Sequence, residues 1–341
     1  MPEKRVSLKS LFDAATCWDA YDHHHSLWLR FGIDHDNLER NLRYYNMCAR
    51  DFRLLDATDM KKFEQGNFHF EFLVENWLPR GSVTLFAATG GVGKSTIAHR
   101  LAMITSTDWE ELGLDPPLWM GSQVTKEFRQ GLVIYLSGED GSAVFGARMK
   151  GFNFPEDPKR LMFLRQDFGI DDTGTPRTFA QFMHYLHKLP DVSLLIIDPA
   201  NKYLSGIEDD AEAVSAFFDA LDNFAIEKNC AVLVLHHLIK GAQPEHVREI
   251  AEILRGSEAF TDRPRVIIGM MLEGQYVVAG LAKNSLPPDL HMVQGERIFA
   301  RDPVNLDLTL LPGERGIRSF TVSQTELEAI RAEKENHETE N

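Results

Sequence analysis

Cysteine is scarce in this chain. Its 341 residues include three cysteines, Cys17, Cys48 and Cys230, an odd and scattered number with no C-x-x-C pair. Because a disulfide framework needs paired cysteines and most cysteine zinc sites need close pairs, the sequence excludes both. A reducing compartment, the cytoplasm, is therefore the expected location.

Long hydrophobic runs are also missing. No apolar stretch approaches the ~20 residues that cross a bilayer, and residues 1–5 lack the apolar core of a secretion signal. We therefore expect a cytoplasmic protein with no membrane partner. A hydrophobic content of 43% is enough to build a core, in one large domain or two modest ones.

The chain also lacks an excess of positive charge. The formal net charge is −15, whereas proteins that sheathe duplex nucleic acid are usually strongly basic. The charge balance bears on nonspecific binding and not on the fold. Any contact with nucleic acid must therefore be local, as in a narrow positive channel.

A glycine-rich loop is the most informative feature that is present. It lies between an apolar run at 83–88 and a helix-like run at 94–104, which is the context in which a phosphate-binding loop works. Loop N–H groups and the positive end of the helix dipole bind polyphosphate. Ala88 stands where the motif G-x-x-x-x-G-K-[ST] has its first glycine, a departure that a negative φ at Ala88 accommodates. The residues expected to bind ATP are Thr89, Gly90, Gly91, Val92, Gly93, Lys94, Ser95 and Thr96, with Lys94 on the β- and γ-phosphates and Ser95 on Mg²⁺.

Apolar strands alternate with helices from about residue 71 onward. Continuous apolar strands of this kind lie in a parallel sheet that helices cover on both faces, so the fold class is α/β. The predicted strands are 83–88, 131–137, 192–198, 231–235 and 305–311, with a hairpin at 265–272 and 276–282, and the predicted helices are 94–104, 143–150 and one around 214–224.

The chain is predicted to have three parts. Residues 1–70 have the pattern of short helices without a chemical motif, and we expect a small helical accessory module. Residues 71–312 form the ATPase domain. Residues 313–341 form an acidic C-terminal tail, which is rich in glutamate.

Charged and polar residues close three of the apolar strands. In an open α/β sheet the groups that act on a phosphate lie at the carboxyl ends of strands, beside the glycine loop. Asp198 ends one strand and is the expected Mg²⁺ ligand, as in the Walker B pattern, and Glu139 ends another and is the expected base for the attacking water. His236 and His237 end the third strand, and alternation along the strand allows only one of them to face the nucleotide.

Several motifs occur in order along the chain. They are Gly90-Gly91-Val92-Gly93-Lys94-Ser95, Tyr135-Leu136-Ser137-Gly138-Glu139-Asp140, Ile197-Asp198, Leu235-His236-His237 through Lys240-Gly241, and Arg255-Gly256-Ser257 with Arg265. Over residues 71–285 this series resembles the RepA-like replicative helicases of plasmids and phages, which are hexameric ATPases of the RecA and DnaB type. The resemblance implies a RecA-like P-loop NTPase core with a mainly parallel sheet.

The resemblance also implies roles for residues of the nucleotide site. Lys94 and Ser95 correspond to the phosphate and Mg²⁺ ligands, Glu139 to the catalytic glutamate and Asp198 to the Walker B aspartate. His237 is similar to the family's sensor histidine.

Three further basic residues correspond to family positions. Arg265 lies where the family has an arginine finger that acts on the neighbouring subunit's nucleotide, and Arg148 matches the position of a functional arginine. Lys283 resembles the lysine of a Lys-x-Arg pair inserted into the neighbouring site, but Ser285 stands at the position of the arginine. A finger supplied by a neighbour requires a homo-oligomer, and the expected one is a hexamer.

The segment from Leu238 to Leu254 lies where the family has its DNA loop in the central channel. Its basic residues are offset by glutamates, and it has no aromatic residue. A loop that follows single-stranded phosphates is ordinarily basic, with aromatic stacking partners. This segment therefore departs from what a DNA-binding loop requires.

Three functions remain open at this level. The leading hypothesis is an ATPase, a ring-forming motor that translocates on single-stranded DNA as a replicative helicase. The second is an ATPase of the same core that acts on a protein partner or as a regulatory switch, which the acidic balance favours. The third is an ATP-dependent assembly or binding protein without motor activity.

Overall fold

The computed structural model describes residues 70–318, apart from 130, 152–159, 166–178, 205–207, 288–289, 291 and 303–306. The chain divides into two units, residues 1–69 and 70–341, and everything below concerns the second. The predicted helical module at 1–70 therefore lies outside the described residues except for Phe70, and so do residues 319–341 of the predicted tail.

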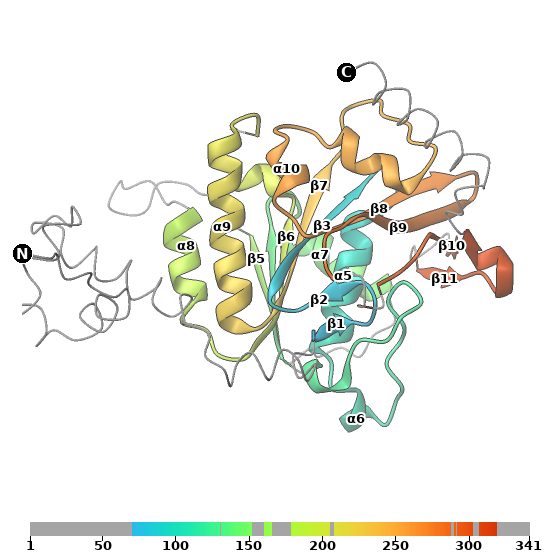
Figure 1. The fold of residues 1–341 in the computed structure, drawn as a ribbon. Helices are drawn as coiled ribbons and strands as arrows, with labels where there is room; N and C mark the ends of the chain where they lie inside the picture. Colours follow the sequence, from blue (N-terminus) through green and yellow to red (C-terminus); the bar gives the residue numbers. More distant parts are fainter. Residues whose placement is uncertain are drawn as a thin grey trace, which may run out of the picture. The chain divides into compact units, whose positions relative to one another are not determined.

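A single large sheet forms the centre of this unit (Figure 1). Its strand order is β11-β10-β9-β8-β3-β7-β6-β4-β5, with β12 paired to β10, and β1 and β2 form a separate small sheet. The six strands from β5 to β8 are parallel to their neighbours, and β9, β10 and β11 follow in antiparallel pairs. The strands are β1 (Phe72–Val74), β2 (Leu78–Pro79), β3 (Ser82–Ala88), β4 (Leu132–Ser137), β5 (Leu161–Arg165), β6 (Val192–Asp198), β7 (Ala231–His237), β8 (Val266–Glu273), β9 (Tyr276–Asn284), β10 (Glu296–Arg301), β11 (Leu308–Leu310) and β12 (Ile317–Arg318).

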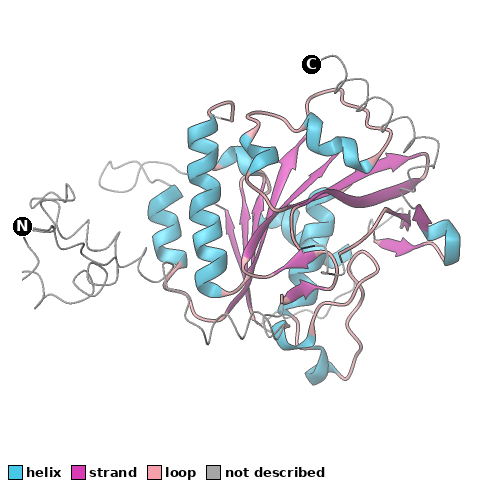
Figure 2. Cartoon of the chain, in the orientation of Figure 1, coloured by secondary structure: helices cyan, strands magenta, loops and turns pink. Residues whose placement is uncertain are grey.

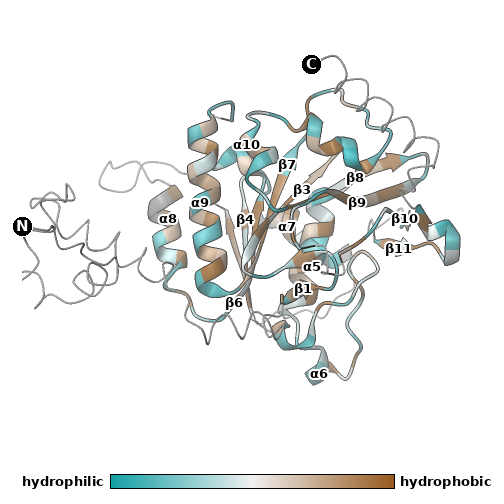
Figure 3. Ribbon diagram, in the orientation of Figure 1, coloured by the Kyte–Doolittle hydropathy of each residue, from teal (hydrophilic) through white to brown (hydrophobic). Residues whose placement is uncertain are grey.

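Helices cover both faces of the sheet, as Figure 2 shows. One apolar cluster joins α5 and α7 to one face, and a second joins α8, α9 and α10 to the other. Along α9 apolar and polar residues alternate, which Figure 3 shows as brown and teal. The α-helices are α5 (Lys94–Ser106), α6 (Trp109–Leu112), α7 (Ser142–Gly151), α8 (Phe179–Leu186), α9 (Ala211–Lys228) and α10 (Ala259–Asp262), and the 3₁₀ turns are η3 (Lys126–Phe128), η4 (Ala200–Lys202), η5 (Val247–Ile253) and η6 (Gly313–Gly316).

The predicted α/β class with a mostly parallel sheet is confirmed. Strand β6 has the predicted bounds, and the predicted hairpin is the antiparallel pair β8–β9, whose turn contains Gly274 at φ +60°. Strands β3, β4 and β7 are each buried along almost their whole length, which is the property that made them visible as apolar runs.

Other elements had no such signal. Strand β10 pairs with β9, β11 and β12, yet half of its residues are charged, so it has no apolar run. Strand β5 is the last strand of the sheet, next to β4, and helix α8 packs against α9. Residues 313–318, at the start of the predicted tail, form η6 and β12 and belong to the sheet.

Candidate nucleotide site

The register of four parallel strands brings the predicted site residues to one edge. Ala88 at the end of β3 is level with His237 on β7, and Ser137 on β4 is level with Asp198 on β6. Since these strands run in the same direction, their carboxyl ends share an edge with the glycine loop. The structure therefore assembles loop, carboxylates and histidines that are far apart in the sequence.

The glycine loop has the open conformation that a phosphate needs. Gly91 has φ +76° and Gly93 has φ +103°, which side-chain-bearing residues rarely adopt. A Cβ atom built on Gly90 or Gly91 would meet no atom within 4 Å. The loop is therefore open on the side where the side chains of residues 90 and 91 would stand. Ala88, which replaces the motif's first glycine, is buried at the end of β3 and needs no special conformation.

Helix α5 begins at Lys94 without a side-chain cap. The side chains of Asp108 and Asp210 cap α6 and α9, whereas the first turn of α5 has neither a side-chain hydrogen bond at its N-cap nor an acidic residue. The first N–H groups of a helix need an acceptor, and a phosphate oxygen is a suitable one. The helix end and the glycine loop together fit a polyphosphate.

Lys94 lies among the acidic groups of this edge. Burial lowers the pKa of its ammonium group, and the charges of Asp198 and Glu139 oppose this effect. A buried ammonium group whose lost hydration is only partly replaced by nearby carboxylates is a good partner for an anion. Lys94 thus has the surroundings expected of a phosphate ligand.

Asp198 and Ser95 are joined in the structure. Asp198 is 7% exposed, and burial raises the pKa of its carboxyl group, while hydrogen bonds from Tyr135 and Ser95 and the charge of Lys94 lower it. The Tyr135 hydroxyl donates to Asp198 Oδ2 at 2.5 Å. A buried carboxylate beside a serine hydroxyl suits a hard cation such as Mg²⁺. Among the residues described, no group of three or more His, Cys, Asp or Glu forms a metal cage, so Mg²⁺ would take its other ligands from phosphate and water.

Glu139 lies two residues beyond the strand end and is half exposed. Its carboxylate Oε1 is 3.9 Å from Lys202 Nζ, on the turn that follows β6. The intervening Gly138 donates its N–H to the Asp198 carbonyl at 2.8 Å, and a Cβ there would be 2.5 Å from Lys202 Cβ. The absent side chain at Gly138 lets the two loops approach, and this keeps Glu139 next to the turn that follows Asp198.

Arg148 on α7 pairs with Asp140, next to Glu139. The Ser137 hydroxyl accepts from Asp140 N at 3.0 Å, which closes the turn after β4. Burial raises the pKa of the Tyr135 hydroxyl, and the charge of Arg148 opposes this rise. Arg148 is therefore close to the site, and within one chain its partner is Asp140.

The two histidines of β7 have different environments. His236 is fully buried, its ring stacks on Phe260 with centroids 3.8 Å apart, and its Nε2 donates to the Arg255 carbonyl at 2.6 Å. His237 is half buried, and burial and the charge of Lys94 lower its pKa, while Glu139 raises it. His236 thus belongs to the core, whereas His237 is the more exposed of the two and lies near Lys94 and Glu139.

Arg265 and Lys283 lie at the other end of the sheet. Met270 on β8 is level with Ala88, so Arg265, five residues earlier, is about 16 Å from the loop end along the strand. Both basic residues line a hollow of about 340 Å³ with Asp222 and Asp262, and Lys283 Nζ donates to the Asp262 carbonyl at 2.8 Å. The structure does not bring Arg265 or Lys283 to the glycine loop of the same chain.

The segment after His237 is folded onto the sheet. Leu238 and Leu254 form an antiparallel bridge, and Arg255 N donates to the His237 carbonyl at 3.1 Å. In its middle, Val247 N donates to the buried carboxylate of Glu296 at 2.8 Å. The segment's ends are thereby tied to the histidines and its centre to β10.

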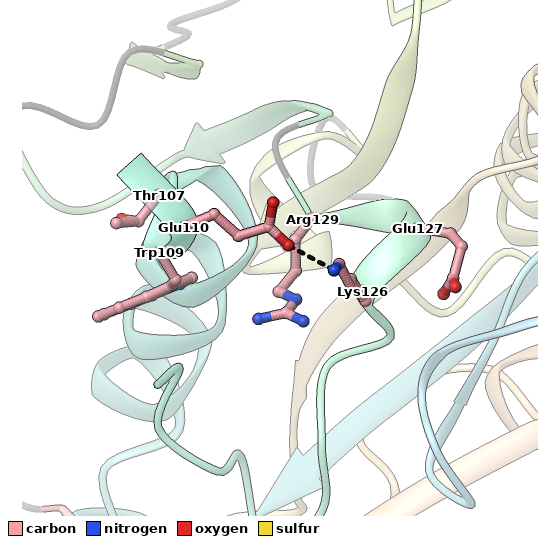
Figure 4. A pocket seen from close by; sticks show the side chains of 6 residues that line it. All are labelled: Thr107, Trp109, Glu110, Lys126, Glu127 and Arg129. Atoms are coloured by element: carbon pink, nitrogen blue, oxygen red, sulfur yellow. Dashed lines mark ion pairs between the residues drawn. The ribbon is translucent and has the colours of Figure 1, made fainter. Parts of the chain in front are cut away.

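A separate hollow of about 280 Å³ contains none of the predicted site residues. Figure 4 shows Glu110 and Lys126 facing each other across it, and their side chains are 2.6 Å apart. Both are well exposed, so this ion pair contributes little to stability.

Two residues near the site were not assigned from the sequence. Tyr135 donates a hydrogen bond to Asp198. The sequence signal for it is a tyrosine within an otherwise aliphatic strand, because a buried hydroxyl needs a hydrogen-bond partner. Arg301 at the end of β10 approaches the glycine loop, with its guanidinium 3.4 Å from the Val92 carbonyl. No local signal marks Arg301, because 209 residues separate it from its contact.

The fold and the site define a P-loop nucleoside triphosphatase. The chain matches the family model AAA_25, an AAA domain, over residues 48–243, which is more than half of its length, and it belongs to this family of P-loop ATPases. The match includes the glycine loop, Glu139, Asp198 and His237 and ends before Arg265 and Lys283. A comparison with curated proteins finds no match. In the described part of the chain, no helix is long and apolar enough to span a membrane.

Proposed function

We propose that the protein is a ring-forming ATPase with a RecA-like core, which translocates on single-stranded DNA as a replicative helicase, with a hexamer as the working assembly. Lys94 and Ser95 bind Mg-ATP together with Asp198, and Glu139 orients and deprotonates the attacking water. His237 senses the γ-phosphate and transmits its loss to the segment 238–254.

The observation that carries this proposal is the separation of Arg265 and Lys283 from their own glycine loop. Hydrolysis requires positive charge on the γ-phosphate in the transition state. These two residues form a basic pair at the end of β8 and β9 opposite that loop. In a ring of subunits this end can face the neighbour's nucleotide, so Arg265 and Lys283 would complete the adjacent site.

The contacts of segment 238–254 support coupling to a polymer. Arg255, the residue that follows the segment, is hydrogen-bonded to both His236 and His237, so a shift of His237 on loss of γ-phosphate would be passed to the end of the segment. Lys240 lies in the exposed stretch at 239–241, which is where the segment offers a cation to a phosphate backbone.

The test is the steady-state ATPase rate with and without single-stranded DNA, at low and moderate salt. A DNA motor is stimulated strongly, and the stimulation falls as salt rises, because phosphate contacts release counterions. Unwinding of a forked duplex should require the same ATP hydrolysis. Hydrolysis indifferent to DNA would contradict the helicase.

A second candidate is an ATPase of the same core that acts on a protein partner or as a switch. The net charge of −15 and the lack of aromatic residues in segment 238–254 favour it. Stimulation of hydrolysis by a protein and not by DNA would identify this function.

A further inference from the structure

Tyr135 makes a short polar contact to Asp198, the Mg²⁺ ligand of the proposed site. Its hydroxyl donates to Asp198 Oδ2 at 2.5 Å, and both side chains are buried, at 0% and 7% exposure. The phenol is a donor here because an ionised carboxylate only accepts. A short hydrogen bond to a charged acceptor in a buried place is among the stronger ones that proteins make.

The sheet register explains why this pair forms. Ser137 on β4 is level with Asp198 on β6, and Tyr135 lies two residues earlier on the same face of β4. On α5, Ser95 and His99 are four residues apart and share one side of the helix. That side meets β4 and β6, with Ser95 on Asp198 and His99 on Tyr135.

The ring of Tyr135 is held from several sides. Its centroid is 4.5 Å from that of His99, 5.7 Å from that of Phe145 and 5.8 Å from that of Phe163. Aromatic rings packed in this way leave little freedom to tilt. The position of the hydroxyl is therefore set by the core, and the hydroxyl in turn sets the orientation of the Asp198 carboxylate.

We propose that Tyr135 is a positioning residue of the Mg²⁺ site: it fixes Asp198 by Oδ2, so that the remaining oxygen is directed with the Ser95 hydroxyl toward the cation of Mg-ATP. This inference rests on the proposed ATPase function. Removal of a group that orients a metal ligand typically lowers metal affinity or activity about 10- to 100-fold.

The test uses binding of a fluorescent ATP analogue by the full chain, titrated with MgCl₂ and measured also in EDTA. Tyr135→Phe removes only the hydroxyl and keeps the ring between His99 and Phe163. We expect unchanged analogue affinity in EDTA, a half-saturating Mg²⁺ concentration raised about 10-fold, a lower kcat and little change in KM. The thermal midpoint should fall by several degrees, because a buried hydrogen bond to a charged group is lost, so the titrations are made well below it.

Two further variants separate positioning from packing. Phe224→Leu disturbs the apolar cluster on the other face of the sheet, where Phe224 is fully buried and has no part in holding Tyr135, so it should lower the thermal midpoint and leave the Mg²⁺ titration unchanged. Adding Tyr135→Phe to Asp198→Asn should change the Mg²⁺ titration little, because the hydroxyl acts through Asp198.

The outcomes are distinct. A normal Mg²⁺ titration for Tyr135→Phe, an equal shift in Phe224→Leu, or additive effects with Asp198→Asn would each overturn the positioning role while leaving the ATPase proposal standing. A wild-type protein that binds the analogue equally well in MgCl₂ and in EDTA would remove the proposed function, and the inference with it.

Discussion

The imidazole of His236 donates to the backbone carbonyl of Arg255 at 2.6 Å, while its ring stacks on Phe260. This hydrogen bond joins the end of β7 to Arg255, the residue at which the chain comes back to β7 after the segment 238–254. The two adjacent histidines therefore have different environments. His236 joins β7 to the residue that follows the segment, and His237 is half buried near Lys94 and Glu139.

Substitution of the two histidines should separate stability from coupling. His236→Ala opens a cavity beside Phe260 and should lower the free energy of unfolding by about 2–4 kcal/mol. His237→Ala, at a half-buried position, should leave stability and ATP binding nearly unchanged and abolish stimulation of hydrolysis by DNA. Urea denaturation and ATPase assays on both variants measure this. Equal effects of the two variants on stability would contradict the division.

Glu139→Gln tests whether hydrolysis is the purpose of the site. The amide has the same shape but cannot deprotonate water, so turnover should fall by ~10²–10⁴ while ATP binding remains. Glu110→Gln, on the separate hollow, is the control and should behave as the wild type. If Glu139→Gln no longer hydrolyses ATP but still supports the function of the protein in the cell, the protein is an ATP-dependent assembly factor and not a motor.

A mixing experiment tests the proposed role of Arg265 in the neighbouring site. Arg265→Ala should retain ATP binding and lose hydrolysis by ~10³-fold or more, the range of known arginine fingers. Lys94→Ala should fail to bind ATP. Mixing the two inactive variants should restore part of the ATPase activity, because some interfaces then combine an intact glycine loop with an intact Arg265.

Arg263 provides the control for that experiment. It lies in the same loop, but its side chain pairs with Asp219, so Arg263→Ala should keep its turnover. No recovery of activity in the mixture, or a protein that stays monomeric with Mg-ATP across a wide concentration range, would refute a finger in trans.

His99 should make stability depend on pH. It is fully buried between Tyr135 and Phe145, and burial, with the charge of Arg148, lowers its pKa from 6.5 to about 3. As pH falls below 6.5, the unfolded chain binds a proton that the folded protein refuses until about pH 3. Stability should therefore fall on acidification, by up to about 1.4 kcal/mol per pH unit from this group.

His99→Phe should reduce that loss. The phenyl ring can occupy the same aromatic group and cannot be protonated, so the variant should gain more stability at pH 5 than at pH 8. Urea denaturation at both pH values measures the difference. The exposed His184 provides the control as His184→Gln, and an equal gain for His99→Phe at both pH values would argue against the buried histidine as the cause.

Gly138→Ala should disturb the site by one methyl group. The added Cβ would lie 2.5 Å from Lys202 Cβ, so the loop after β6 must move, at a cost of about 1–3 kcal/mol. Turnover should fall because Glu139 and Asp198 separate. Gly146→Ala on α7 is the matched control, since its Cβ would meet nothing within 4 Å. Normal turnover in Gly138→Ala would show that the close approach of the loops is dispensable.

The sequence by itself determined the parallel core and the nucleotide edge of the sheet. Strands such as β3 and β6 are buried on both faces, so their continuous apolar runs stand out. The glycine loop and the strand-end residues Asp198 and Glu139 follow them directly, and backbone direction alone brings them together.

Only the tertiary structure decided the rest. The resemblance pointed to His237, but the contacts of His236 with Phe260 and Arg255, which hold it in the core, became visible only in the structure, and the partner of Tyr135 depends on the register of β4 with β6. Local sequence patterns indicate which residues are buried and whether a segment is a helix or a strand. These contacts join residues that are far apart in the sequence, and no local pattern predicts such a pairing. For the same reason the distance of Arg265 from its own glycine loop, on which the proposed ring depends, became visible only when β8 was paired with β3.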